Sequence, residues 1–341
     1  MGVNLTPIIL KRVVDLPALR GRSLAVDAFN VLHQFLALIR TRDGRPLTDE
    51  EGRVTSGLVG LASRTTRLIA DYQMRLVFVF DGKSPPLKRA EVERRRALRR
   101  RAEQEYATAV EAGDRATALS KAVMTGRLTS DLISDSKRLL DILGVPWVQA
   151  PGEGEAQAAH MARRGDVWAV NSRDYDALLF GAPRLVRYLT IHGEEWLPSR
   201  SRARRLMPEV IDLEALLRHH DITREQLVDL SIMVGTDFNS GIRGIGPKTA
   251  LRLVKRHGGL EEMPTEIAAR LPENYAEIRR LYLEPEVTDD YRIEWGAMQE
   301  DELYAFLCGE RAFSRRRVEL VADRMRRFQR QRSLVDWLGE A

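Results

Sequence analysis

The chain has 341 residues, of which 44% are hydrophobic and 30% are charged, a composition typical of a globular protein with one large folded unit. The net charge is only +5, but an isoelectric point near 9.4 favours an anionic partner such as nucleic acid. A single cysteine, Cys308, excludes an intrachain disulfide and suits an intracellular protein. No apolar stretch approaches the roughly 18 residues of a membrane span, so we expect no insertion into a membrane.

Apolar runs of strand length alternate with helical patterns through the first part of the chain. The predicted strands are rich in Val, Leu and aromatic residues and cover residues 22–29, 75–81, 145–150, 167–172 and 184–189. Between them lie helix-length segments such as residues 55–74, which open with Thr and Ser and carry apolar residues at three- and four-residue steps. This alternation predicts an α/β fold with a central, mostly parallel sheet covered by helices on both faces.

The strand pattern fades after about residue 208, and short helices are expected instead. The helical candidates are residues 209–220, 248–258 and 315–328. The last dozen residues resemble a loose tail. No internal repeat is present.

Carboxylates follow one apolar run after another. In an open parallel sheet, ligands bind beyond the carboxyl ends of the strands, so these positions should meet at one edge. One Asp after a strand is usually a turn or cap residue, but seven acids are harder to explain in that way. The seven are Asp27, Asp81, Glu153, Glu155, Asp174, Asp176 and Asp237.

These acids predict a metal site. Their mutual repulsion would drive several of them to bind protons unless a cation neutralised them. Hard oxygen ligands without His or Cys select Mg²⁺, with Mn²⁺ as a substitute. Two ions about 4 Å apart would hold both the attacking and the leaving oxygen of a phosphodiester displacement.

Residues 83–101 form a strongly basic segment directly after Asp81, and nine of them are Lys or Arg. On a helix, Lys88, Arg95 and Arg99 would share one face. A solvated, charge-laced helix is the plain alternative, but the neighbouring acids favour a role in gripping the scissile phosphate.

Two further patterns point to macromolecular partners. Residues 241–254 place a Gly-Ile-Gly turn before a helix, and such a turn lets the backbone approach a phosphate. The tail QRSLVDWL carries an aromatic side chain that has little use within a short polar tail, which favours a partner's pocket. The alternatives are a simple turn in the first case and a tail folded back on its own domain in the second.

Four separated stretches, VFVFDGKSPPLKR, APGEGEAQAAHMA, NSRDYDALLFGAPRLVR and VGTDFNSGIRGIGPKTAL, resemble the archaeal branch of the flap structure-specific endonucleases of the XPG-type 5′ nuclease superfamily. The resemblance implies a Mg²⁺-dependent enzyme that cuts 5′ flaps of branched DNA in replication and repair, with 5′-3′ exonuclease activity. It implies that Asp27, Asp81, Glu153 and Glu155 surround one ion. The second ion would lie among Asp174, Asp176 and Asp237, with Glu155 between the two.

The same resemblance assigns roles around the metal site. Lys88 and Arg95 would contact the scissile phosphate from a helical arch, while Arg40 and Arg64 match two further family arginines near the site. His33 stands where the family usually has a Tyr that stacks on a flap base, so stacking is expected to differ here. A helix-hairpin-helix would hold the duplex, with K⁺ at its backbone carbonyls; its residues are Gly244, Gly246, Lys248 and Thr249. A sliding-clamp peptide would comprise Gln331, Leu334, Trp337 and Leu338.

We expect a monomer with one nuclease domain over residues 1–330. Its parts would be residues 1–81, an arch at 82–130, an internal region at 131–235, the hairpin at 236–260 and C-terminal helices at 261–328, followed by a clamp-binding tail at 329–341. Three alternatives were weighed: a DNA-binding scaffold without catalysis, a haloacid-dehalogenase-type phosphatase, and a sister nuclease for bubbles or Holliday junctions. Intact acids argue against the first. Lys83, in place of a second Asp, argues against the phosphatase.

Overall fold

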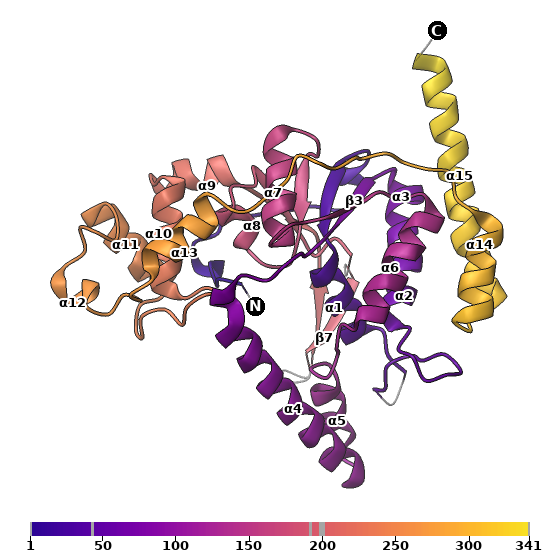
Figure 1. The fold of residues 1–341 in the computed structure, drawn as a ribbon, viewed down its shortest axis with the longest axis horizontal. Coiled ribbons are helices and arrows are strands. Elements are labelled where there is room, and N and C mark those ends of the chain that lie inside the picture. The colour runs from indigo at the N-terminus through magenta and orange to yellow at the C-terminus, as the bar shows by residue number, and fades with distance from the viewer. Residues whose placement is uncertain (1, 42–43, 191–192, 198–201, 340–341) are drawn as a thin grey trace.

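The computed structural model in Figure 1 describes residues 2–41, 44–190, 193–197 and 202–339, with backbone alone at 90, 115–116, 193–197, 202–205 and 332–339. Within this part of the chain, a seven-stranded sheet has the order β1-β9-β6-β5-β2-β3-β4. Its strands are β1 (Arg12–Val13), β2 (Ser23–Asp27), β3 (Arg75–Phe80), β4 (Trp147–Gln149), β5 (Ala169–Asn171), β6 (Arg184–Arg187) and β9 (Glu209–Asp212). A separate antiparallel pair joins β7 (Gly193–Leu197) to β8 (Arg202–Leu206).

Strands β2 to β6 run parallel to one another in this sheet. Strand β9 is antiparallel to both β6 and β1. All five predicted strands are confirmed, and so is the mostly parallel α/β fold. The prediction of a helix from residue 209 is wrong at its start. Val210 and Ile211 are buried and pair with β6, and Asp212 then caps the following helix by accepting from the Ala215 N–H at 2.9 Å.

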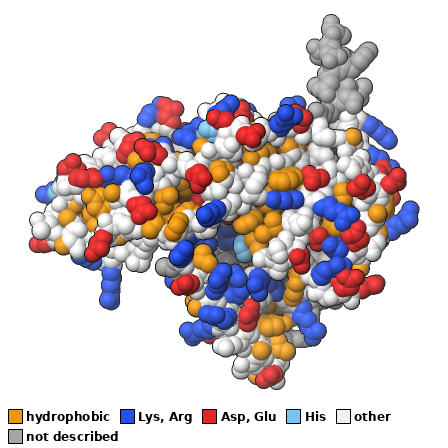
Figure 2. Space-filling view, viewed as in Figure 1, with side chains coloured by type: hydrophobic (Ala, Val, Ile, Leu, Met, Phe, Trp, Pro, Cys, Tyr) orange, Lys and Arg blue, Asp and Glu red, His pale blue; other side chains and the backbone are white. Residues whose placement is uncertain are grey.

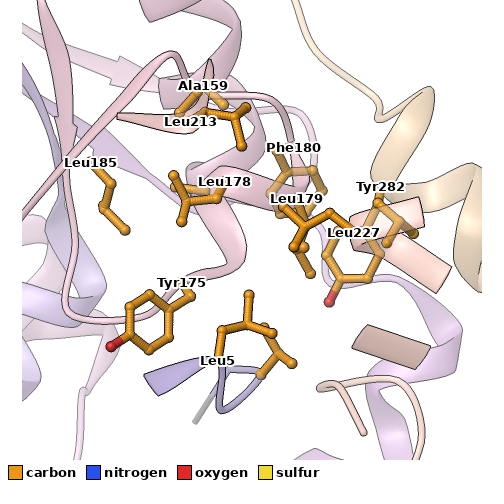
Figure 3. Packing of buried hydrophobic residues seen from close by; sticks show 14 of the residues in the cluster. Leu5, Ala159, Tyr175, Leu178, Leu179, Phe180, Leu185, Leu213, Leu227 and Tyr282 are labelled. Carbon is orange, nitrogen blue, oxygen red and sulfur yellow. The ribbon is translucent and has the colours of Figure 1, made fainter. Parts of the chain in front are cut away.

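The central strands are buried on both faces, and their side chains alternate between two hydrophobic cores. On β3, Leu76, Phe78 and Phe80 point into one core, whereas Val77 and Val79 point into the other. Figure 3 shows part of the second core, where Phe180 packs against Tyr282 with ring centroids 4.9 Å apart. Parallel sheets have both faces covered because the helices that connect their strands pack on each face.

Helices cover the two faces of the sheet. One core takes α1 (Ala28–Leu38), α2 (Ser56–Gly60), a π-helical turn (Leu61–Thr65), α3 (Thr66–Tyr72), α6 (Ser130–Leu143), α14 (Glu300–Tyr304) and α15 (Arg315–Gly339). The other takes α7 (Gly154–Arg164), α8 (Asp176–Leu179), α9 (Leu213–His220), α10 (Arg224–Val234), α11 (Pro247–His257), α12 (Thr265–Ala268) and α13 (Tyr275–Leu283). Among the described residues, no helix combines the length and apolar character needed to cross a membrane.

The C-terminal segment differs from its prediction. Residues 331–339 continue helix α15 rather than forming a loose tail (Figure 1). No Pro interrupts this segment, so nothing in the local sequence ends the helix earlier.

A long helix, α4 (Arg89–Glu111), and a short one, α5 (Arg115–Ala122), project together from the body of the molecule (Figure 1). They lie inside the segment for which an arch was predicted. A 3₁₀ turn, Pro86–Lys88, leads from β3 into α4. The first turn of α4 therefore begins close to the carboxyl edge of the sheet.

An irregular strap, residues 284–299, runs from α13 across the molecule to α14 (Figure 1). The buried Gln157 amide of α7 binds it twice, donating to Thr288 O at 2.9 Å and accepting from Thr288 N at 2.8 Å. The Gly296 N–H donates to Gly144 O at 2.9 Å. The strap therefore fixes α7, the helix that begins beside Glu153 and Glu155.

We predict that Gly144→Ala destabilises the protein more than Gly165→Ala. Both glycines end helices at positive φ, +67° and +85°, where a side chain costs about 1–2 kcal/mol. A Cβ at Gly144 would also lie 2.3 Å from Gly296 O, whereas nothing lies within 4 Å of one at Gly165. Chemical denaturation should show the larger loss of unfolding free energy for Gly144→Ala, and equal losses would contradict the tight packing of the strap.

Candidate active site

Six of the seven predicted acids lie at the carboxyl edge of the sheet, as expected. Asp27 ends β2, Asp81 follows β3, Glu153 and Glu155 open α7 after β4, and Asp174 and Asp176 follow β5. Asp237 differs in origin, because it follows helix α10 rather than a strand.

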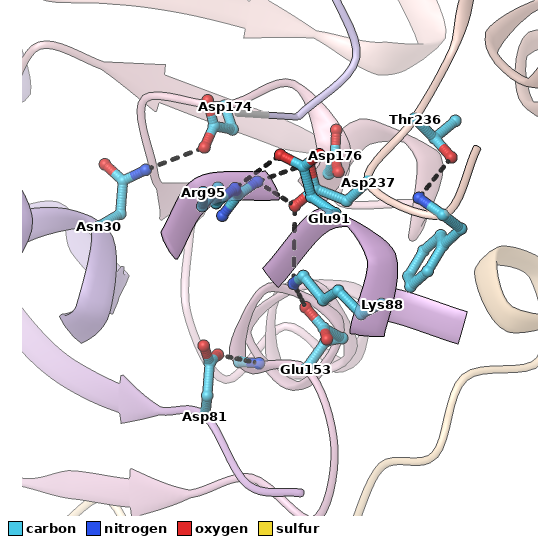
Figure 4. A network of polar contacts seen from close by, with 12 residues as sticks. Asn30, Asp81, Lys88, Glu91, Arg95, Glu153, Asp174, Asp176, Thr236 and Asp237 are labelled. Atoms are coloured by element: carbon cyan, nitrogen blue, oxygen red, sulfur yellow. Dashed lines mark hydrogen bonds and ion pairs between the residues drawn. The ribbon is translucent and has the colours of Figure 1, made fainter. Parts of the chain in front are cut away.

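The structure nevertheless brings Asp237 to the other acids. Lys88 is the bridge: its Nζ contacts Glu153 and lies 3.7 Å from Asp237 Oδ2. Figure 4 shows Asp81, Glu153, Asp174, Asp176 and Asp237 around this lysine and the nearby Arg95. All seven predicted acids therefore belong to one region, which we call the acidic cluster.

Arg95 forms the second ionic link into the acidic cluster. Its Nη2 lies 2.7 Å from both carboxylate oxygens of Asp237, and its Nε donates to Glu91 at 2.7 Å. Lys88 and Arg95, which were predicted to contact the scissile phosphate, pair directly with acids of the cluster in this structure (Figure 4). Among the described residues, no three Asp, Glu, His or Cys side chains are grouped so that they could hold an ion as they stand. These two cations lie between the acids, and metal binding would require them to move.

Burial makes the acidic cluster electrostatically costly. Burial and the nearby Asp81 raise the pKa of Asp27 to about 8, and burial and Glu153 raise that of Asp81 to about 6. Burial, Asp237 and Asp174 raise the pKa of Asp176 to about 7. The pKa of Glu155 is also raised well above its ordinary value, by burial and then by Asp176. Carboxyl groups with such pKa values bind protons near neutral pH unless a cation replaces those protons.

The pKa values of Lys88 and Asp237 shift in the directions that favour the charged form of each group. Burial alone would lower the pKa of Lys88, but Glu153, Asp237 and Asp81 raise it above its ordinary value. Burial would raise the pKa of Asp237, yet the surrounding positive charges, Arg95 and Lys88 among them, lower it. Asp237 therefore stays ionised in this arrangement.

The donor set fits a hard divalent cation. It consists of carboxylate oxygens, the ligands that Mg²⁺ prefers. Glu155 Oε1 is buried and has no hydrogen-bond partner, which is costly for a carboxylate unless something else coordinates it. Main-chain donors support other oxygens: Val3 N lies 2.9 Å from Asp176 Oδ1 and Gly154 N lies 2.7 Å from Asp81 Oδ1.

The sequence analysis missed several residues that border the acidic cluster. The Asn30 amide donates to Asp174 Oδ2 at 3.2 Å, and Ser172 Oγ lies 3.4 Å from Asp27 Oδ2. The Tyr282 hydroxyl, fully buried in α13, lies 3.4 Å from Asp176 Oδ2. Only their nearness to strand ends could have pointed to Asn30 and Ser172, and nothing local pointed to Tyr282.

The predicted flap-contacting residue, His33, lies exposed on α1 and faces the arch cations. The surrounding protein atoms, and then Arg99 and Arg95, lower its pKa to about 4. His33 is therefore neutral at physiological pH and presents an uncharged ring. In Figure 2, Lys and Arg side chains gather around the hollow between the arch and the body.

The two further predicted arginines have different surroundings. Arg40 donates to Gly44 O at 2.9 Å, and Arg64 donates to Thr190 O at 2.9 Å. Burial lowers the pKa of both guanidinium groups. In the described part of the chain, the hydrogen bonds of these two side chains go to backbone carbonyls and not to the acidic cluster. Their direct involvement in chemistry stays a prediction.

The hairpin region joins α10 to α11. Gly246 is the N-cap of α11, and Lys248 and Thr249 lie in its first turn. Gly244 has φ +87° and open space where a Cβ would stand, so the backbone can meet a ligand closely there. The exposed Gly244, Gly246 and Lys248 fit the predicted phosphate contact.

The predicted clamp peptide is described only in part. Gln331 is exposed and accepts a hydrogen bond from Gln73 at 3.1 Å. Leu334, Trp337 and Leu338 follow in the backbone of α15, but their side chains lie outside the described residues. The clamp assignment therefore stays a prediction.

A mostly parallel sheet with buried carboxylates at its carboxyl edge, opposed by cations on a projecting helix, defines a class of metal-dependent nucleases. Comparisons with known proteins agree. The XPG N-terminal domain model matches residues 1–103, and the XPG I-region model matches residues 144–237.

Flap endonuclease 1 of Aeropyrum pernix is 50% identical over 337 residues, covering 95% of this chain and 94% of that protein. The Methanothermobacter thermautotrophicus enzyme of the same name is 45% identical and covers 99% of this chain and all of its own. The solved flap endonuclease-1 from Methanococcus jannaschii superposes with a TM-score of 0.76 at 35% identity, covering 97% of this chain and 100% of that one. The chain belongs to the flap endonuclease family.

We predict that, in EDTA, the protein loses stability as pH rises from about 5 to 8.5. Asp27, Asp81 and Asp176 have folded pKa values of about 8, 6 and 7, all above the ordinary 3.8. The folded state therefore binds more protons than the unfolded state below these values, and that stabilisation is lost as pH passes through them. Thermal unfolding should show a decline of roughly 5 °C or more.

The control for this pH effect is Asp27→Asn, which keeps an oxygen to cap α1 but cannot ionise. Its thermal midpoint should depend less on pH than that of the wild type. A wild-type midpoint that stays flat or rises over this range would contradict the burial of uncompensated acids.

Proposed function

We propose that this enzyme hydrolyses a phosphodiester near the junction between a 5′ single-stranded flap and duplex DNA. The observation that carries the proposal is the acidic cluster at the carboxyl edge of the sheet with Lys88 and Arg95 lying among its members. Acids alone could bind metal without catalysis, and cations alone could bind DNA without cleaving it. Their combination suits phosphodiester cleavage, where negative charge builds up on the reacting phosphate.

In this proposal, two Mg²⁺ ions bind the acidic cluster, and Mn²⁺ can replace them. Asp27, Asp81, Glu153 and Glu155 would hold one. Asp174, Asp176 and Asp237 would hold the other, with Glu155 shared. Bound there, the ions supply an activated water and neutralise charge on the reacting oxygens. The unpartnered Glu155 Oε1 supports this shared role.

Lys88 and Arg95 would change partners during the reaction. Both now pair with acids of the cluster, at Glu153 and Asp237. With those acids neutralised, Lys88 and Arg95 would be available to bind the scissile phosphate, which is itself an anion. Lys88 is the N-cap of the arch helix α4 and Arg95 lies within it, so both would approach the phosphate from the arch.

The DNA would be held at two places. The arch, formed by α4 and α5, would surround the flap, with the neutral ring of His33 available to stack on a base. The hairpin with Gly244, Gly246, Lys248 and Thr249 would hold the duplex backbone without reading its sequence, with K⁺ as a further ligand of its carbonyls. Affinity should then fall with salt, by about 0.9 in log K per log unit of salt for each phosphate neutralised.

Membership of the family supports the wider setting that we propose. We place the enzyme inside the cell, as a monomer acting in Okazaki-fragment maturation and repair, with 5′-3′ exonuclease activity beside flap cleavage. We retain the division into one nuclease domain and a C-terminal clamp-binding segment, with Gln331, Leu334, Trp337 and Leu338 contacting the sliding clamp.

The test is cleavage of an end-labelled double-flap DNA in Mg²⁺, mapped to single nucleotides. We expect a cut at or one nucleotide inside the flap junction, and no cut in EDTA. Asp174→Ala should abolish this cleavage while DNA affinity stays nearly unchanged, because Asp174 serves metal chemistry more than grip. DNA that is bound but uncut by the wild type would favour a scaffold or a sister junction nuclease. Equal losses of binding and rate in Asp174→Ala would contradict its assigned role.

We predict that Lys88→Ala lowers the single-turnover cleavage rate by about 10²–10³-fold, because one cation is lost from the developing charge. The matched control is Arg218→Ala, which removes an exposed arginine of α9 that faces Glu214 at 3.7 Å. The control should stay within about twofold of the wild type, as expected for an exposed pair of little energetic weight. A cleavage rate for Lys88→Ala equal to that of the control would show that Lys88 takes no part in the reaction.

A further inference from the structure

A line of polar side chains runs away from the acidic cluster through helix α1, and two of its members, Gln34 and Thr190, are buried. Asn30 Nδ2 donates to Asp174 Oδ2 at 3.2 Å. One turn further along the same helix, Gln34 Nε2 donates to Asn30 Oδ1, and the Thr190 hydroxyl in turn lies 3.3 Å from Gln34 Oε1. These contacts join Thr190 to Asp174 through two amides.

The direction of these hydrogen bonds is consistent along the whole line. The Thr190 hydroxyl donates to Gln34, Gln34 donates to Asn30, and Asn30 donates to the carboxylate. Gln34 is only 8% exposed and Thr190 only 2%, so water does not readily replace either group. Leaving one such buried group unsatisfied is costly, and the two amides are therefore held in a single orientation.

Both ends of the line are anchored. Near the acids, Asn30 Oδ1 also accepts from Arg173 N at 3.2 Å, and Asn30 N donates to Asp27 Oδ1 at 2.9 Å. At the far end, Thr190 O accepts from Arg64 Nη1 at 2.9 Å. Arg64 lines a cavity of about 330 Å³ together with Arg67 and Arg324, so Thr190 is fixed against a basic part of the body.

We propose that Gln34 is a positioning residue for the metal site, and that Thr190 holds Gln34 in place. Gln34 touches neither the acids nor any reacting atom. It acts by keeping the Asn30 amide turned so that its N–H, rather than its oxygen, faces Asp174. The inference rests on the proposed function, since it takes Asp174 as a metal ligand.

The size of the expected effect follows from metal sites in general. Removing a hydrogen-bond partner that orients a ligand typically weakens metal binding or activity by about 10–100-fold. Gln34 is one residue further from the ligand than such a partner. We therefore expect an effect near the lower end, about 10-fold.

The experiment measures Mg²⁺ binding to the full chain without DNA, by isothermal titration calorimetry. Gln34→Met keeps the length of the side chain but neither hydrogen bond. Thr190→Val removes the hydroxyl at nearly constant shape, whereas Thr190→Ser retains it. We expect about 10-fold weaker Mg²⁺ binding for Gln34→Met, a smaller loss for Thr190→Val and a value close to the wild type for Thr190→Ser.

A second readout separates positioning from general damage. If Gln34 positions the site, excess Mg²⁺ should restore most of the cleavage rate of Gln34→Met on double-flap DNA, with DNA affinity unchanged. Unchanged Mg²⁺ affinity in Gln34→Met would overturn the inference. If Gln34→Met does not fold, as judged by circular dichroism, the two Thr190 variants provide the test. Equal Mg²⁺ affinities for Thr190→Val and Thr190→Ser would overturn the inference.

The two proposals can fail separately. A wild-type protein that binds Mg²⁺ but does not cut double-flap DNA would refute the proposed function, whatever the variants do. A wild type that cuts normally, beside a Gln34→Met variant with normal Mg²⁺ affinity, would refute only the role of Gln34.

Discussion

The arrangement of this molecule depends on one electrostatic constraint, the crowding of seven carboxylates into a largely buried region at the edge of a sheet. Burial and mutual repulsion raise the pKa values of Asp27, Asp81 and Asp176 far above that of a free Asp. Like charges in such a place need protons, main-chain donors or cations. The structure uses main-chain donors at several oxygens and brings Lys88 and Arg95 in from the arch.

The rest of the fold can be understood as support for this cluster. The parallel strands bring six acids to one edge, and glycines at the start of α7 and directly after Asp81 allow close approach. A Cβ at Gly154 would lie 2.6 Å from Asp81 Oδ1, and one at Gly82 would lie 2.1 Å from Ala150 O. The strap of residues 284–299 binds α7 from outside through Gln157. Under the proposed function, the same cations would serve acids or phosphate, and the arch would couple metal binding to the hold on DNA.

Much of this could be predicted from the sequence because the signals are local. Runs of Val, Leu and Phe long enough for buried strands identified β2 to β6, and acids after those runs identified most of the cluster. The parallel topology then required those acids to meet. The basic segment after Asp81 predicted the two cations for the same reason, since it directly follows a strand end.

What could not be predicted depends on contacts between distant segments. Tyr282 reaches the cluster from α13, more than one hundred residues from its partner Asp176. The local pattern of residues 209–212 predicts the start of a helix, but these four residues form strand β9 by pairing with β6 and β1. Gln34 and Thr190 gave no signal at all, because a polar residue in an apolar helix or loop reveals its partner only in three dimensions.

We propose that divalent cations replace Lys88 and Arg95 as partners of the acids. The most direct measurement is anomalous diffraction from crystals of the protein soaked in Mn²⁺. This account predicts two Mn²⁺ peaks among the seven carboxylates, one on each side of Glu155, with Lys88 displaced from Glu153 and Arg95 from Asp237. Absence of Mn²⁺ at the cluster with both ion pairs intact would contradict it, and would make the acids and cations a structural network instead.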